Sequence, residues 1–344
     1  MYKIESNIVA EAKEMRIVFA EVMEEMAAAD PRVIYLDADL INSIGMTKYW
    51  KAHPEKAINC GIQEANMIGV AAGMSATGLI PFTHTFGTFA TRRVMDQVFV
   101  SAAYAKLNVR IIGSDPGITA SLNGGTHMPL EDIGMMRCVP EVTIIEPTDS
   151  VMLSDMLRQT KDKYGVFYIR LSRKKAEKIF TDHSTFEIGK AAEVKSGTDV
   201  TIFASGIMVA EAVQAAKMLE QEGISAAVSN MFTIKPIDKD AVIKAALTTG
   251  AIVTAENHNI TNGLGSAVAE VLSENQCCPL ERIGVKDIFG EVGTVDYLKE
   301  TFHMTAADIA GAAKKAIMRK YRESIKKGGE CNVFMGNYQN NARL

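Results

Sequence analysis

The stretch GIQEANMIGVAAGMSATG, residues 61–78, is followed directly by LIPFTHTF, residues 79–86, and together they decide how the chain is built. The first part carries apolar and small residues at helical spacing, which predicts a helix over 63–77. The second part is a short, mostly apolar run, which predicts a strand. A helix that leads directly into an apolar strand is typical of a parallel sheet covered by helices on both faces.

The same alternation extends in both directions from this stretch. Upstream, apolar positions at helical spacing predict a helix over 8–29, and VIYLDAD predicts a buried strand over 33–39. Downstream, the pattern predicts a helix near 91–105, strands 109–115, 142–147 and 166–173, a helix 149–160, and a Gly-rich loop 116–129. Ligands of such sheets bind beyond the carboxyl ends of the strands, where the acids and glycines of this chain cluster.

The length of 344 residues favours two domains over one. The polar stretch KKAEKIFTDHSTF, residues 174–186, loses periodicity and is interpreted as a linker. A second alternation then begins, with strands predicted over 200–206, 224–230 and 251–257 and helices over 209–222, 264–274 and 306–322. We therefore expect an α/β protein of two domains, residues 1–180 and 187–325, each a mostly parallel sheet covered by helices. The Gly/Asn-rich stretch 326–344 is expected to be a flexible tail.

Composition narrows the class of partner. A net charge of −4 and a hydrophobic content of 47% give no reason to expect nucleic acid or an anionic membrane. No apolar run approaches the roughly 20 residues that a membrane-spanning helix needs, and the start mixes both charges, unlike a signal peptide. The five cysteines show no CxxC spacing, so neither a disulfide framework nor a zinc site is indicated. These features favour a reducing cytoplasm.

Two constellations carry candidate chemistry. Glu64 opens the predicted helix 63–77, whose small residues allow another helix to pack closely, so its carboxyl group would be partly desolvated. An acid in the first helical turn also favours the positive end of the helix dipole without any catalytic role, so the position alone leaves both readings open. His127 emerges beside two glycines of the predicted loop, where an imidazole suits proton transfer near neutral pH.

These stretches resemble the transketolase family. GIQEANMIGVAAGMSATG is similar to the segment with the glutamate that contacts the thiamine pyrimidine, TFGTF (85–89) to the aromatic pair, and GGTHMPLED (124–132) to the THQP-containing loop. The resemblance continues through Asp37-Ala38-Asp39-Leu40, MMRCVPEVTIIEPTD (135–149) and ASGIMVAEAVQAAKMLEQEGISAAVSNMFTIKPID (204–238), and covers nearly everything from residue 10 to about 320. It implies the pyrimidine-binding and C-terminal domains of a thiamine-diphosphate enzyme.

The resemblance assigns roles to individual residues. Glu64 would hydrogen-bond the pyrimidine ring of thiamine diphosphate, with Phe86 and Phe89 stacked on or flanking it. His127 would move protons on sugar hydroxyls, so Glu64 and His127 are the expected catalytic residues. The substrate-binding residues implied are Arg16, Ser43, Asn123, His127 and Arg173.

Two positions depart from the family pattern. Asn123 stands where transketolases usually carry an aspartate that reads a substrate hydroxyl, and Asp115-Pro116 occupies the region of a phosphate-binding histidine. An asparagine still hydrogen-bonds but brings no charge. Both changes surround the substrate rather than the cofactor, so we expect thiamine chemistry with an altered sugar specificity.

The family binds Mg²⁺ and the diphosphate through a GDG motif in a preceding domain, and no GDG occurs in this sequence. The resemblance therefore implies no metal ligands in this chain and a separate N-terminal subunit that supplies the diphosphate and Mg²⁺ site. A heterotetramer of two chains of each kind is expected, acting on sugar phosphates as the C-terminal subunit of a split transketolase.

Three alternatives stay open. The beta subunit of a 2-oxo-acid dehydrogenase has the same two domains, although the TH-P arrangement in GGTHMPLED argues against that family. A deoxyxylulose-phosphate synthase shares the thiamine glutamate but normally carries all three domains on one chain, so it would have to be a split version. The non-enzyme alternative is a silent paralogue that stabilises or regulates a transketolase.

Overall fold

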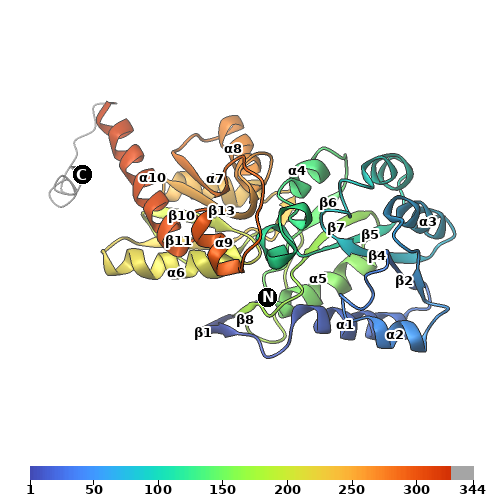
Figure 1. The fold of residues 1–344 in the computed structure, drawn as a ribbon. Coiled ribbons are helices and arrows are strands. Elements are labelled where there is room, and N and C mark those ends of the chain that lie inside the picture. The colour runs from blue at the N-terminus through green and yellow to red at the C-terminus, as the bar shows by residue number, and fades with distance from the viewer. Residues whose placement is uncertain (327–344) are drawn as a thin grey trace.

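The computed structural model describes residues 1–326 and shows two large sheets side by side, each covered by helices (Figure 1). The predicted flexible tail lies outside the described residues apart from position 326, at the end of the last helix. The predicted fold class is confirmed: both halves are mostly parallel sheets flanked by helices.

The first sheet has seven strands in the order β12-β6-β7-β5-β4-β2-β3. Their bounds are β12 Thr233–Lys235, β6 Thr143–Ile145, β7 Val166–Leu171, β5 Val109–Ser114, β4 Ile80–Phe86, β2 Val33–Asp37 and β3 Ala57–Asn59. All neighbours are parallel except β12 and β6. Every residue of β2, β4, β5 and β7 is buried, as expected for strands covered on both faces.

Helices cover both faces of this sheet. Helix α1 (Met15–Ala29) packs with α5 (Ser150–Asp162) on one face, and α3 (Glu64–Ala76) packs with the π-helix η1 (Gln97–Tyr104) on the other. Shorter helices lie at the ends of strands: α2 Thr47–Ala52, the 3-10 turns η2 Gly117–Asn123 and η3 Gly125–His127, and α4 Asp132–Arg137. Alternate residues of the strands therefore enter two separate apolar cores.

The second sheet has five strands in the order β14-β13-β10-β11-β9, parallel except for β9 against β11. Their bounds are β14 Leu280–Val285, β13 Ile252–Asn259, β10 Val200–Ala204, β11 Ala226–Asn230 and β9 Ala192–Lys195. Helices α6 (Met208–Gln221) and α10 (Ala306–Lys326) pack together, as do α7 (Lys239–Thr248) and α8 (Leu264–Glu274). Helix α9, Val295–Thr301, lies against η2 of the first half.

The structure differs from the predicted elements near the N-terminus. Residues 4–10 form a strand, β1 (Ile4–Ala10), so residues 8–14 of the predicted helix 8–29 are not helical and α1 begins only at Met15. Its partner is β8 (Glu177–Phe180), an antiparallel strand within the stretch predicted as a linker. The apolar spacing of residues 8–14 fitted a helix locally, but pairing with a segment near residue 178 satisfies the backbone of both stretches, and local spacing cannot reveal that partner.

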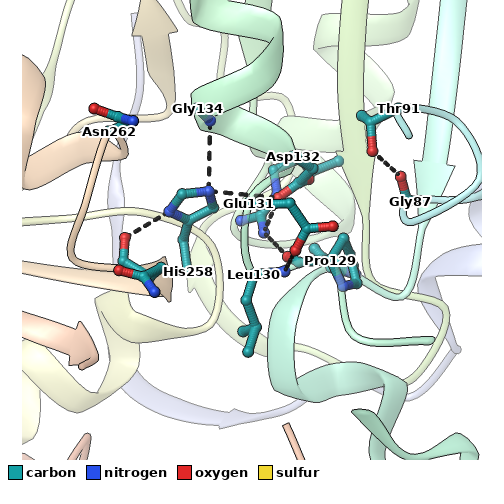
Figure 2. A network of polar contacts seen from close by, with 12 residues as sticks. Gly87, Thr91, Pro129, Leu130, Glu131, Asp132, Gly134, His258 and Asn262 are labelled. Atoms are coloured by element: carbon teal, nitrogen blue, oxygen red, sulfur yellow. Dashed lines mark hydrogen bonds and ion pairs between the residues drawn. The ribbon is translucent and has the colours of Figure 1, made fainter. Parts of the chain in front are cut away.

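A buried ion cluster joins the two halves, and Figure 2 shows one of its members, Asp132, beside His258. The guanidinium of Arg170, on β7, is fully buried and donates to both carboxylate oxygens of Asp132, at 2.8 and 3.1 Å, and to Glu146 at 2.6 Å. It also donates to the main-chain oxygen of Asn257 in the second half, at 3.0 Å. Burial would lower the pKa of Arg170, but the two carboxylates outweigh it and raise that pKa. Arg170 therefore keeps its positive charge inside the protein.

His258, from the second half, lies against the same cluster as a neutral imidazole. Its Nδ1 donates to the carbonyl of Asn259 at 2.6 Å, and its Nε2 accepts the N–H of Gly134 at 3.5 Å (Figure 2). Burial lowers the pKa of His258 to about 4. Burial also raises the pKa of the neighbouring Glu256 to about 7, although that carboxylate accepts the N–H groups of Leu264 and Gly265.

We predict that Arg170→Met lowers the free energy of unfolding by about 3–5 kcal/mol, because it leaves two buried carboxylates without their cation. The control is Arg158→Met, which removes a half-exposed pair with Glu25 and is expected to cost about 0–1 kcal/mol. Urea unfolding measures both variants. If both variants lose the same free energy of unfolding, the cluster does not stabilise the contact between the two halves.

We also predict that His258 stays neutral from pH 8 down to about pH 5, because its folded pKa lies near 4. Since the unfolded chain binds that proton first, this group weakens stability as the pH falls from about 6.5 towards 4. Titration of the imidazole nitrogen resonances by NMR measures the midpoint directly. A midpoint above pH 6 would contradict this assignment.

Candidate active site

Three rings meet beyond the carboxyl end of β4. Phe86 is the last residue of this strand and Phe89 follows in the next turn, so both project at the same edge of the sheet. The ring of His127, at the end of η3, stands edge-on to both, with ring centroids 5.8 Å from Phe86 and 5.3 Å from Phe89. The fold thus brings three of the predicted site residues into one cluster.

Glu64 joins this cluster through Arg93. The carboxyl group of Glu64, in the first turn of α3, is only 5% exposed and accepts a hydrogen bond from Arg93 Nη1 at 2.6 Å. The same guanidinium lies 3.8 Å from the centre of the Phe89 ring, a cation–π contact. Arg93 was not among the residues expected at the site from the sequence. The signal available was the pair Arg92-Arg93 shortly after the aromatic pair.

A cavity of about 340 Å³ opens beside these groups, lined by Thr88, Phe89, Arg92, Arg93, Thr126 and His127. Arg92 crosses one side of it, donating to the carbonyl of Thr126 at 3.0 Å and pairing with Glu131 at 3.1 Å. Thr126 Oγ1 lies 3.0 Å from His127 Nδ1, which orients the imidazole. The cavity therefore offers an aromatic face, two guanidinium groups and an imidazole to one small ligand.

Arg16 and Arg173 form a second cluster on the other side of Phe86. Both guanidinium groups donate to the main-chain oxygen of Ser43, at 3.1 and 3.2 Å. Arg173 also lies 5.0 Å from the centre of the Phe86 ring, which links the two clusters. The Ser43 hydroxyl makes no hydrogen bond within residues 1–326, so it is the carbonyl that holds the arginines together.

Each arginine of the second cluster already has an acidic partner. Arg16 pairs with Glu14 at 2.6 Å, and Arg173 Nε lies 2.9 Å from both carboxylate oxygens of the buried Asp115. The positive charge at this position is therefore largely balanced by the chain itself.

Asn123 stands apart from both clusters. It is the exposed last residue of η2, and its side chain makes no hydrogen bond to any part of the chain that the structure describes. Within residues 1–326, no group of three or more His, Cys, Asp or Glu is arranged to hold a metal ion. No helix in that range is long and apolar enough to cross a membrane.

The fold and the site define a class: a two-domain α/β chain whose site lies at the carboxyl edge of its first sheet. Residues 11–178 match the family described as "Transketolase, pyrimidine binding domain", and residues 189–309 match "Transketolase, C-terminal domain". The chain belongs to the transketolase family and corresponds to its C-terminal section.

Individual relatives agree with this assignment. The chain is 51% identical over 306 residues to the 6-deoxy-6-sulfo-D-fructose transketolase subunit SqwH of Clostridium sp. (strain MSTE9), covering 89% of this chain and 95% of that protein. It is 35% identical over 270 residues to one of the subunits of the apulose-4-phosphate transketolase of Phocaeicola vulgatus. The match covers 78% of this chain and 86% of that subunit. A solved "split gene transketolase, inactive beta4 tetramer" superposes with a TM-score of 0.83 at 41% identity, covering 89% and 99%.

We predict that Asp115→Asn strengthens sulfate binding at the Arg173 cluster about tenfold, because it releases the guanidinium from its carboxylate. Asparagine keeps the side-chain size and tolerates the φ of 56° at this position. Isothermal titration with sodium sulfate measures the change. Asp182→Asn changes the net charge equally at an exposed pair with Lys178 and serves as the control. An equal change in both variants would contradict a local effect.

Proposed function

We propose that this chain is the C-terminal subunit of a split, thiamine-diphosphate-dependent transketolase, a transferase that moves a two-carbon ketol unit from a ketose to an aldose. The observation that carries the proposal is the cluster of Glu64, Arg93, Phe89 and His127 around one cavity. Residues 1–180 form the pyrimidine-binding domain in this proposal, and residues 187–325 the C-terminal domain. The enzyme works in the cytoplasm, where exposed thiols such as Cys138 and Cys277 stay reduced.

The residues of the cluster fit the aminopyrimidine ring of thiamine diphosphate. The Arg93 guanidinium is planar, lies on the Phe89 ring and donates an N–H to Glu64. An aminopyrimidine is also planar and would stack on Phe89, and one of its ring nitrogens would share a proton with Glu64 once Arg93 swings aside. When bound, thiamine diphosphate supplies an electron sink for cleavage of the carbon–carbon bond next to a ketone.

Each side chain then has a defined task. Glu64 holds a proton at a pyrimidine nitrogen, since a nearly buried carboxyl group can share a proton with a ring nitrogen. Phe89 supports one face of the ring, and Phe86 packs beneath His127. His127 moves a proton at a substrate hydroxyl, a task that suits an imidazole near neutral pH.

The Arg16 and Arg173 cluster, with Ser43 between the two arginines, orients the anionic end of the ketose. Asn123 would hydrogen-bond a substrate hydroxyl without contributing charge. Because Glu14 and Asp115 already balance the two guanidinium groups, the surplus positive charge is small. A small surplus favours a singly charged sulfonate over a doubly charged phosphate. We therefore propose a ketose ending in an anionic group, with 6-deoxy-6-sulfo-D-fructose as the first donor to test, alongside sugar phosphates.

A separate N-terminal subunit supplies the diphosphate and Mg²⁺ site in this proposal, and two chains of each kind form a heterotetramer. The surface of helix α3, which begins at Glu64, is suited to close packing against this second subunit. Its exposed Gly69 and Gly73 have open space above them, so another helix can approach the backbone. Beside them η1 exposes Phe99 and Val100, 43% and 50% accessible, and adjoining apolar side chains next to these glycines suit a contact with a partner.

The test is ketol transfer by this chain, alone and mixed with the diphosphate-domain polypeptide from the same source, in thiamine diphosphate and Mg²⁺. The donors are 6-deoxy-6-sulfo-D-fructose and a panel of ketose phosphates. We expect activity only in the mixture and a loss of at least about 100-fold in kcat for Glu64→Gln, which keeps the size of the side chain but cannot share a proton in the same way. Glu21→Gln, at an exposed pair with Lys13, is the matched control.

Other results would separate the alternatives. Activity of the chain alone would contradict the split site. An inactive mixture that still binds thiamine diphosphate, but acts on 2-oxo acids, would favour the beta subunit of a 2-oxo-acid dehydrogenase. An inactive mixture that binds no cofactor would favour a silent paralogue.

A further inference from the structure

The loop that carries Asn123 and His127, residues 116–131, lies against the C-terminal domain. At its far end, the main-chain N–H of Asn259 donates to the carbonyl of Leu130 at 2.9 Å. Figure 2 shows this end of the loop beside His258. The six residues that line the cavity all come from positions 88–127, so no described residue of the C-terminal domain lines it, whereas that domain does contact this loop.

Asn257 holds the near end of the loop. Its side chain is fully buried at the end of β13, where Nδ2 donates to the carbonyl of Pro116 at 2.8 Å. Its Oδ1 accepts the N–H of Ile118, also at 2.8 Å. The amide thus pairs with the loop backbone as a neighbouring strand would, using both its donor and its acceptor.

Gly117 shows how closely the two segments meet. It lies between the two bonded residues with a φ of 51°, a conformation that favours glycine. A Cβ at this position would overlap both the side chain and the main chain of Asn257. The loop therefore reaches Asn257 only because residue 117 has no side chain.

A third contact holds the middle of the loop. Ser121 Oγ donates to the carbonyl of Gly293 at 2.8 Å. A Cβ on Gly125 would overlap the main chain of Gly290, so the two backbones are in direct contact there. The loop is thus held at its start, middle and end by residues of the C-terminal domain, on either side of Asn123 and His127.

We propose that the C-terminal domain serves catalysis by positioning the 116–131 loop, and that Asn257 is its main positioning residue. This inference rests on the proposed function for its catalytic consequence. Asn257 touches neither the cavity nor the aromatic cluster. It sets where the loop backbone begins, and therefore where His127 stands against Phe86 and Phe89.

Asn257→Ala tests the proposal in the full chain. Without its two hydrogen bonds, amide hydrogen exchange in the peptide covering 116–131 should become about tenfold faster, with Ile118 affected most. In the reconstituted pair, kcat should fall about tenfold or more while the affinity for thiamine diphosphate stays within about threefold, because Glu64 is untouched. Gly117→Ala should reproduce both effects from the loop side, leaving the C-terminal core unchanged.

Asn230→Ala is the matched control. Asn230 is also fully buried, at the end of the parallel strand β11 of the same sheet, but it donates to Thr148 and does not contact the loop. Its variant should leave exchange in 116–131 and kcat unchanged. Wild-type exchange in both Asn257→Ala and Gly117→Ala would overturn the proposal, and so would equal loosening of the loop by Asn230→Ala. If Asn257→Ala fails to fold, the exchange and kcat of Gly117→Ala alone test the proposal.

The exchange measurement separates this inference from the proposed function. A wild-type pair without ketol transfer would reject the proposed function, while exchange in the chain alone still tests the contact between Asn257 and the loop. If the reconstituted pair is active, but Asn257→Ala and Gly117→Ala change neither the exchange in 116–131 nor kcat, the inference is rejected and the proposed function stands.

Discussion

The guanidinium of Arg170 is fully buried and ties the two halves of the chain together. A guanidinium removed from water needs acceptors for its N–H groups and balancing negative charge. Arg170 finds them in Asp132, Glu146 and the carbonyls of Pro129 and Asn257. These groups come from both halves of the chain, so the two sheets must be docked before the charge is satisfied. Pro129 and Asp132 flank the end of the 116–131 loop, and the same docking therefore sets the edge of the candidate site.

Charge balance is the second constraint on the site. The four arginines around Phe86 and Phe89 each face an acid of the same chain: Arg93 faces Glu64, Arg92 faces Glu131, Arg16 faces Glu14 and Arg173 faces Asp115. These pairs keep the residues in place without a ligand. A ligand must then displace or share an existing partner, so the strength of each pair contributes to specificity.

The sequence predicted the alternation of strands and helices well, because β2, β4, β5 and β7 are apolar over most of their length and helical spacing is a local property. It was wrong about residues 8–14, which were predicted as helix, and it did not predict β1 and β8, which pair across more than 160 residues. It also missed β12, a short strand from the second half that joins the sheet of the first. Each of these elements depends on a partner that local periodicity cannot identify.

The α/β class, the family resemblance and the residues expected at the site could all be read from the sequence, because motifs such as GIQEAN and GGTHMPLED are contiguous. How these motifs contact one another became visible only in the folded chain. Arg93 meets Glu64 across 29 residues, and Asn257 meets Ile118 across 139. The energy of such contacts depends on distance, burial and hydrogen-bond geometry, and these quantities exist only once distant segments are packed together.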